Sequence, residues 1–258
     1  MLVLDGLTKH FGGVRAVDGI NVEVEQGKVF GLIGPNGSGK STTVNLICGV
    51  FPATSGRIVF NGIDITRMPT HRRLSVGIAR TFQNIRLFED LTVWQNLWVA
   101  QNSEEDVRHG FFGRWLGGSR AGRSEVEALL ASSGLHAKRN DLARNLAFGE
   151  QRRLEMARAL AAKPKLLLLD EPAAGMSAEE IETLADWIRS LQAGGMTVLL
   201  VEHVMDLVMG VSDHIAVLNF GLKIADGSPE EIQDDQQVRE AYLGTGRNAE
   251  EAAGAANQ

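Results

Sequence analysis

A glycine-rich segment near the N-terminus carries residue types that bind phosphate. Residues 34–41 read Gly-Pro-Asn-Gly-Ser-Gly-Lys-Ser and match the pattern G-x4-G-K-[ST]. The glycines let backbone N–H groups converge on phosphate oxygens at a helix start, Lys40 supplies charge to the β- and γ-phosphates, and the Ser41 hydroxyl can ligate Mg²⁺. The candidate cofactor-binding residues are Gly34, Pro35, Asn36, Gly37, Ser38, Gly39, Lys40, Ser41 and Thr42, together called the phosphate loop. The alternative, a glycine-rich turn with an accidental lysine, is disfavoured by the flanking strand and helix patterns.

Two adjacent carboxylates form the second candidate group. The apolar run Leu166–Leu169 precedes Asp170 and Glu171, so both acids are expected at the carboxyl edge of a sheet, where open α/β folds bind ligands. We expect Asp170 to hold Mg²⁺, directly or through water, and Glu171 to orient and polarise the water that attacks the γ-phosphate. Alone, such a pair more often caps a helix, but the phosphate loop reverses that preference.

Periodicity indicates the elements that position these residues. Alternation around Val22 and Val24, and an Asn61-Gly62 pair between two short segments, predict antiparallel strands in the first third of the chain. The phosphate loop lies between a short apolar strand, Val29–Ile33, and a helix at Ser41–Cys48. The order strand, loop, helix is the context that a phosphate-binding loop requires.

The rest of the chain changes from a helical to an alternating helix and strand pattern. A capping box at Thr92 and Gln95 begins a helical stretch that continues to about residue 162. Three later runs lack alternation, as strands buried on both faces do: Leu166–Leu169, Val198–Val201 and Ile215–Leu218. These predict a mostly parallel α/β core. A final helix is expected to start after Ser228 and end near Gly244, followed by a disordered tail at 245–258.

Composition excludes several classes of protein. The 258 residues suit one larger globular domain, or a core domain with a smaller appendage, and the net charge of −6 gives no support for binding nucleic acid. No apolar run approaches the roughly 18–20 residues that span a bilayer, and no signal peptide is evident, so a cytosolic protein is expected. A single cysteine, Cys48, excludes an internal disulfide and a multi-cysteine metal site.

A third motif connects these groups to a known family. Residues 145–160 form a glycine-containing loop that opens a helix upstream of Asp170. The loop resembles the L-S-G-G-Q signature of ATP-binding cassette (ABC) proteins, and its order with the phosphate loop and Leu-Asp-Glu-Pro172 is specific to them. The resemblance implies ATP and Mg²⁺ as cofactors and two nucleotide-binding subunits packed head to tail. The signature residues that would face the γ-phosphate of the partner chain are Ala147, Phe148, Gly149 and Glu150.

The same resemblance implies the fold and domain organisation. It predicts an α/β, P-loop nucleotide-binding domain over residues 1–244 with a mixed, mostly parallel core sheet. An antiparallel β subdomain and an inserted helical subdomain at about residues 90–162 complete it.

The signature and the loop after Glu171 depart from the family pattern at three positions. Ala147 replaces a serine whose hydroxyl contacts phosphate, and Glu150 replaces glutamine. An acid near polyphosphate would repel it unless the side chain points back to its own loop. Ser177 replaces an aspartate in the loop that couples the two sites. Because Lys40 and Glu171 are both present, we expect an altered but competent ATPase.

Three further residues lie where the resemblance predicts a function. Phe11 would stack on adenine, with a core phenylalanine as the alternative. Gln83 would link Mg²⁺ to the helical subdomain and take part in catalysis. His203, directly after the Val198–Glu202 strand, would contact the γ-phosphate; a lone histidine there is otherwise more often structural.

The resemblance is strongest to ATP-binding subunits of bacterial branched-chain amino acid importers. The identifying stretches are Phe11–Val17, Arg80–Phe88, Asn145–Leu160, Glu171–Met176 and Val201–Met209. Such subunits lie at the cytoplasmic face of the inner membrane, attached to two permease subunits, with a solute-binding protein delivering substrate. The alternatives are the ATPase of a lipid or lipopolysaccharide exporter, and a soluble ABC ATPase without a transport role.

Overall fold

The computed structural model describes residues 1–81, 85–101 and 120–242, and its chain divides into two compact units. The first unit combines Met1–Thr70 with Ser177–Gln258, and the second comprises His71–Met176. Among the described residues no helix is long and apolar enough to cross a membrane.

An antiparallel sheet forms the N-terminal part of the first unit. Its strands are β1 (Leu2–Phe11), β2 (Val14–Val24), β4 (Ser55–Phe60) and β5 (Ile63–Asp64), in the order β2-β1-β4-β5. On β2, Ile20, Val22 and Val24 are buried and alternate with exposed residues, as the sequence predicts. Between β4 and β5, Asn61 and Gly62 both adopt positive φ angles, 49° and 78°, so the predicted hairpin is confirmed.

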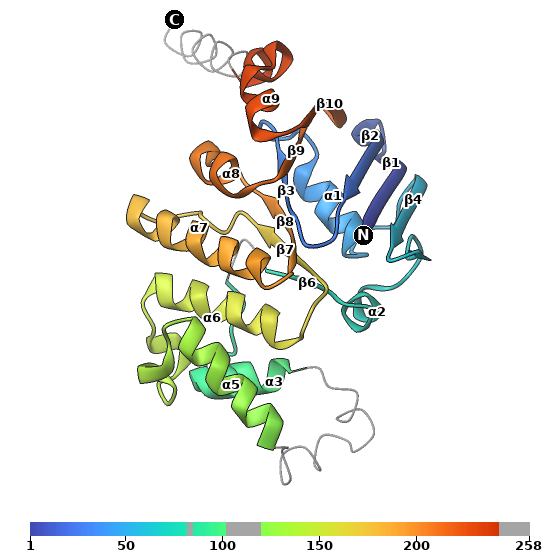
Figure 1. Cartoon of the computed structure of the whole chain (residues 1–258). Coiled ribbons are helices and arrows are strands. Elements are labelled where there is room, and N and C mark those ends of the chain that lie inside the picture. The colour runs from blue at the N-terminus through green and yellow to red at the C-terminus, as the bar shows by residue number, and fades with distance from the viewer. Residues whose placement is uncertain (82–84, 102–119, 243–258) are drawn as a thin grey trace, which may run out of the picture. The chain divides into compact units, whose positions relative to one another are not determined.

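The first unit contains a second set of strands, and one of them, β3, directly precedes the phosphate loop (Figure 1). Strand β3 (Val29–Ile33) pairs in parallel with both β8 (Thr197–Val201) and β9 (His214–Asn219), and β10 (Leu222–Gly227) pairs antiparallel to β9. Every residue of β3 and β8 is buried, which explains why their sequences are apolar without alternation. The helices of this unit are α1 (Lys40–Ile47), α7 (Ala178–Ala193), α8 (Met205–Val211) and α9 (Pro229–Asp234).

The C-terminal helix differs from the expectation. Helix α9 begins after Ser228 in a capping box, as predicted, but it ends at Asp234 rather than near Gly244. Asp235 is extended, and its carboxylate accepts a hydrogen bond from the backbone N–H of Val238 at 3.0 Å. Residues 236–242 then form a separate helical segment. An aspartate that can cap a new helix therefore divides one predicted helix into two.

The second unit holds two parallel strands and a helical cluster. Strand β6 (Ile78–Arg80) pairs with β7 (Leu166–Asp170), and Ile78 aligns with Leu166. The helical elements are α2 (Thr70–Ser75), α3 (Val93–Ala100), α5 (Arg120–Ser132), the short 3-10 helices η1 (His136–Lys138) and η2 (Ala143–Asn145), and α6 (Phe148–Ala161). The capping box at Thr92 and Gln95 is present.

A hydrophobic core holds α3, α5 and α6 together. Its buried members are Val93, Leu97, Val126, Leu130, Leu135, Ala143, Leu146, Leu154 and Ala157. Helix α6 starts at Phe148, so Phe148, Gly149 and Glu150 lie in its first turn and Ala147 is its N-cap. The predicted fold class, with a mixed and mostly parallel set of core strands, an antiparallel sheet and helices, is confirmed.

Candidate nucleotide-binding site

The lysine of the phosphate loop is held inside the loop by backbone carbonyls. Lys40 begins α1 and is only 6% exposed, and its Nζ donates to the carbonyl oxygens of Gly34 at 2.7 Å and Pro35 at 3.0 Å. The loop therefore wraps around its own cation at the positive end of a helix. The loop can therefore offer the Lys40 ammonium to a phosphate, while the two carbonyl oxygens supply its hydrogen bonds when no ligand is bound.

Two glycines allow the loop to pack closely on the surrounding backbone. Gly34 has φ 148°, and a Cβ there would lie 2.1 Å from the carbonyl oxygen of Leu218. Gly39 has φ 109°, and its Cβ would lie 2.4 Å from the carbonyl oxygen of Ala16. The backbone N–H of Gly221 also donates to the Ser38 carbonyl at 3.0 Å. A side chain at either glycine would move the loop, so these positions require glycine.

The hydroxyls of the loop fit an anion. Ser38 is 2% exposed, and its Oγ has no hydrogen-bond partner among the residues that the structure describes. A buried hydroxyl in that state is costly unless a ligand completes its hydrogen bonding. Ser41 in the first turn of α1 is exposed, whereas Thr43 donates to the Gly39 carbonyl at 3.0 Å. The loop thus has a satisfied frame and hydroxyls left for phosphate and metal.

Two other predicted residues belong to the same unit. Phe11 is 43% exposed, which does not fit the core alternative, and its ring contacts Phe51 edge-on at 5.3 Å. The backbone N–H of His203 donates to the fully buried carboxylate of Glu202 at 2.8 Å. The His203 side chain is 55% exposed, so its backbone is fixed while its ring remains open to a ligand.

The paired carboxylates occupy the end of β7 in the second unit. Asp170 is 5% exposed, and its Oδ2 lies 2.5 Å from Nη2 of Arg80. Glu171 has a positive φ of 47°, an unusual conformation for a residue with a side chain and one that clusters at functional sites. Its carbonyl oxygen accepts a hydrogen bond from Nη2 of the buried Arg152 at 3.4 Å. Helix α6 is therefore fastened to the backbone of the predicted catalytic glutamate.

The signature residue Glu150 points back to its own loop. Its Oε2 accepts from the backbone N–H of Ala147 at 3.0 Å, and its Oε1 lies 2.7 Å from Nζ of Lys138. Lys138, together with that backbone bond, holds the pKa of the Glu150 carboxyl below its ordinary value. The arrangement is half of a capping box, because Ala147 has no hydroxyl to complete it. Glu150 thus meets the condition under which an acid does not repel a nearby polyphosphate.

Ser177, in the loop that follows Glu171, caps a helix. Ser177 caps α7 through two hydrogen bonds with Glu180. The Ser177 backbone N–H donates to Glu180 Oε2 at 2.9 Å, and the Glu180 backbone N–H donates to Ser177 Oγ at 3.3 Å. Serine and aspartate are both good caps, so Ser177 preserves the helix start. Gly175 in the same loop lies against the ring of Phe148, which is itself 53% exposed.

Several predictions lie outside the described residues, and several contacts were not predicted. Gln83 and the tail at 245–258 fall outside the described part of the chain. Sequence reasoning missed Arg80, Arg152 and Tyr242. Burial raises the pKa of the Tyr242 hydroxyl, while a hydrogen bond from the backbone of Gly34 opposes this shift. An arginine at a strand end was the one available signal for Arg80.

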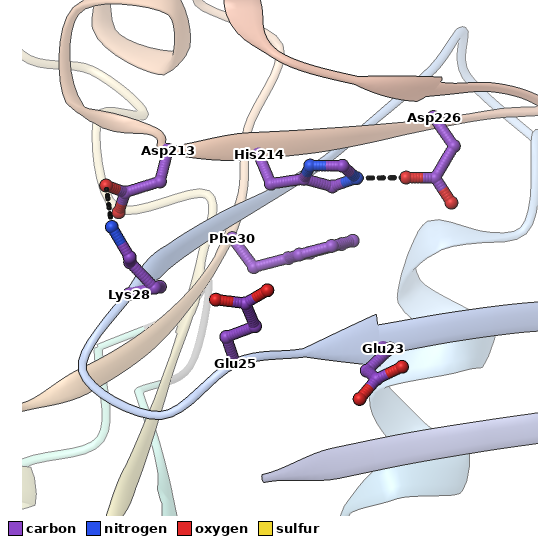
Figure 2. Close-up of a pocket in the computed structure, with 7 residues that line it drawn as sticks. All are labelled: Glu23, Glu25, Lys28, Phe30, Asp213, His214 and Asp226. Carbon is purple, nitrogen blue, oxygen red and sulfur yellow. Dashed lines mark hydrogen bonds and ion pairs between the residues drawn. The ribbon is translucent and has the colours of Figure 1, made fainter.

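A separate pocket opens elsewhere in the first unit. It has a volume of about 380 Å³ and is lined by Glu23, Glu25, Lys28, Phe30, Asp213, His214 and Asp226. Figure 2 shows Lys28 paired with Asp213 and the His214 ring directed at Asp226. The pocket includes Lys28, which precedes β3, whereas the phosphate loop follows the other end of that strand. It contains no predicted site residue.

The donor groups suit Mg²⁺ better than a transition metal. Among the described residues there is no group of three or more histidine, cysteine, aspartate and glutamate side chains that could hold a metal. Ser41 in the first unit offers a hydroxyl and Asp170 in the second offers a carboxylate, and oxygen groups of both kinds ligate Mg²⁺ when substrate phosphates complete its shell.

Comparison with known proteins places these motifs in a family. The model described as ABC transporter matches residues 17–174, and the one described as branched-chain amino acid ATP-binding cassette transporter matches residues 223–248. The chain is 43% identical to the high-affinity branched-chain amino acid transport ATP-binding protein BraF of Pseudomonas aeruginosa, over 95% of this chain and 98% of BraF. It is 41% identical to LivG of Escherichia coli, with the same coverage.

A more distant relative and a solved structure complete the comparison. The lipopolysaccharide export system ATP-binding protein LptB of Haemophilus influenzae is 32% identical, over 95% of this chain and 97% of LptB. The ADP conformation of MJ1267, an ATP-binding cassette of an ABC transporter, is 32% identical with a TM-score of 0.83, over 95% of this chain and 98% of that chain. With a buried phosphate-loop lysine, an Asp-Glu pair at the end of β7 and these relatives, the chain belongs to the ABC transporter family of ATP-binding ATPases.

Proposed function

We propose that this protein is the ATP-hydrolysing subunit of a bacterial importer for branched-chain amino acids. The observation that carries the proposal is the likeness over nearly the whole chain to BraF and LivG, extended by a branched-chain-specific match at residues 223–248. In this account one nucleotide-binding domain spans residues 1–244, with a helical subdomain at about 90–162 and a tail beyond.

The phosphate loop would bind the triphosphate. Backbone N–H groups and Lys40 would contact the β- and γ-phosphates, and Phe11 would stack on the adenine. Ser41, Asp170 and Gln83 would hold Mg²⁺, which supplies neutralisation of phosphate charge when bound. The closed cradle at Gly34 and Gly39 and the orphaned Ser38 hydroxyl support this assignment.

Glu171 would polarise the attacking water, and His203 would contact the γ-phosphate. The positive φ of Glu171 and the hydrogen bond from Arg152 to its carbonyl oxygen fix the backbone from which this side chain extends. The exposed ring of His203 on a fixed backbone suits a residue that engages its ligand only when the site closes.

A second ABC subunit, either another copy of this chain or a related paralogue, would complete each site. The signature residues Ala147, Phe148, Gly149 and Glu150 of one chain would face the γ-phosphate held by the phosphate loop of the other, head to tail. The retained glycine and the inward-bonded Glu150 support a working signature despite the missing serine. Gly149 lies in the first turn of α6, whose positive end favours an anion.

Closure and reopening of that dimer would drive transport through separate membrane subunits. We infer two permease subunits, an indirect solute-binding protein and a peripheral position at the cytoplasmic face of the inner membrane, with no nucleic-acid partner. The alternative function is that of the ATPase of a lipid or lipopolysaccharide exporter, as LptB is named. The identities of 43% to BraF and 32% to LptB favour import of branched-chain amino acids.

The experiment compares purified parent, Lys40→Ala and Glu171→Gln proteins. With ATP and Mg²⁺, the parent should hydrolyse ATP, Lys40→Ala should fail to bind it, and Glu171→Gln should retain ATP as a stable dimer. Binding is measured with a fluorescent ATP analogue and dimerisation by light scattering. A Glu171→Gln protein that turns over at the parental rate would refute the assignment of Glu171.

A further inference from the structure

Arg80 and Asp170 form a buried ion pair at the ends of two neighbouring strands. Arg80 is the last residue of β6 and Asp170 the last residue of β7, and their side chains are 12% and 7% exposed. Nη2 of Arg80 lies 2.5 Å from Oδ2 of Asp170. An arginine and a carboxylate buried together in this way form a charge-assisted hydrogen bond.

The strand register fixes this pair. Arg80 aligns with Leu168 in the parallel ladder, so its side chain reaches two residues further along β7 to Asp170. Thr81 reinforces the position, because its backbone N–H donates to the Leu168 carbonyl at 2.9 Å and its Oγ1 accepts from the Asp170 N–H at 3.4 Å. The pairing is therefore part of the fold at this sheet edge.

A bound arginine and a metal ion compete electrostatically for one carboxylate. Arg80 already pairs with the single negative charge of Asp170, so a divalent cation arriving alone is attracted more weakly to that carboxylate and is repelled by the guanidinium. A metal that arrives on a triphosphate brings several negative charges with it. Nucleotide thus supplies the attraction that the paired carboxylate lacks.

We propose that Arg80 occupies the Asp170 carboxylate when nucleotide is absent and makes metal binding at Asp170 conditional on ATP. By pairing with Asp170, Arg80 disfavours the binding of Mg²⁺ that arrives without nucleotide. The inference rests on the proposed role of Asp170 as a metal ligand. It differs from a purely structural ion pair, which would leave the metal affinity of the nucleotide-free chain unchanged on removal of the arginine.

The test measures Mn²⁺ binding, as a stand-in for Mg²⁺, by electron paramagnetic resonance on the full-length chain. Parent, Arg80→Met and Arg80→Gln proteins are titrated with Mn²⁺, first without nucleotide and then with ATP. Arg80→Gln keeps a hydrogen-bond donor beside Asp170, so it carries the test if Arg80→Met does not fold. Arg144→Gln is the matched control, because it removes the same charge from an exposed pair with Asp90 in the same unit.

Loss of the guanidinium should tighten nucleotide-free Mn²⁺ binding by about tenfold or more, and Arg144→Gln should not change it. Adding Asp170→Asn to either Arg80 variant should abolish the gain. Unchanged nucleotide-free affinity in a folded Arg80→Gln protein would overturn the inference. If Asp170→Asn instead leaves Mn²⁺ binding with ATP unaltered, the proposed role of Asp170 fails and the inference fails with it.

Discussion

Glu150 offers a quantitative test of how the altered signature is held together. Its side chain makes two separable contacts, a 3.0 Å bond to the Ala147 backbone N–H and a 2.7 Å ion pair with Lys138. Glu150→Ala removes both. Losing a capping bond costs about 0.5–2 kcal/mol, and losing a partly exposed pair costs about 0.2–1 kcal/mol. The free energy of unfolding should therefore fall by about 1–3 kcal/mol in Glu150→Ala.

Two matched variants separate the contributions. Glu150→Gln keeps an oxygen that can accept from the Ala147 N–H, since glutamine also serves at this position of a capping box. Lys138→Met removes only the ion pair. Both should lose about 0.2–1 kcal/mol in urea unfolding, clearly less than Glu150→Ala. If Glu150→Gln were as destabilised as Glu150→Ala, the backbone bond would contribute nothing and the explanation of this acid would be wrong.

Three further predictions concern the same chain. Ala147→Ser should complete the capping box and raise the free energy of unfolding by about 0.5–2 kcal/mol over the parent in the same urea titration, and an unchanged free energy would contradict the missing-hydroxyl explanation. Gly34→Ala should abolish ATP-analogue binding, because its Cβ would lie 2.1 Å from the Leu218 carbonyl oxygen; normal binding would contradict that packing, and Gly13→Ala, with open space around its Cβ, is the control. The lowered pKa of Glu150 gives stability that is complete above its ordinary value of 4.5 and lost as pH falls through the lower folded value. Unfolding curves of parent and Glu150→Gln should thus converge below pH 4.5, and a constant difference down to acid pH would refute the ion pair.

Much of the fold could be predicted because local patterns and burial agree. The Asn61-Gly62 hairpin, the capping box at Thr92 and the unalternated strands β7, β8 and β9 each follow from residue types within a few positions. The end of α9 could not be predicted in this way. Both a continuous helix and a break capped by Asp235 satisfy the local pattern, and tertiary packing decides between them.

The candidate site was predictable as a set of residues and not as a set of contacts. The phosphate loop and Asp170 with Glu171 stand out because their chemistry depends on fixed spacing. The partners that hold them, Arg80 for Asp170 and Arg152 for Glu171, lie 90 and 19 positions away in sequence. No local rule links such pairs. The direction of Glu150 likewise depended on Lys138, 12 positions upstream.

The central claim, that this ATPase drives a branched-chain amino acid importer, is tested most directly by its membrane partners. Tagged Glu171→Gln protein would be purified with ATP and Mg²⁺ from gently solubilised source membranes, with Lys40→Ala as the control that does not close. Mass spectrometry should identify two permeases of the branched-chain type in the Glu171→Gln sample. Subunits of a lipopolysaccharide exporter in their place would contradict the substrate, and ribosomal proteins without a membrane partner would contradict transport itself.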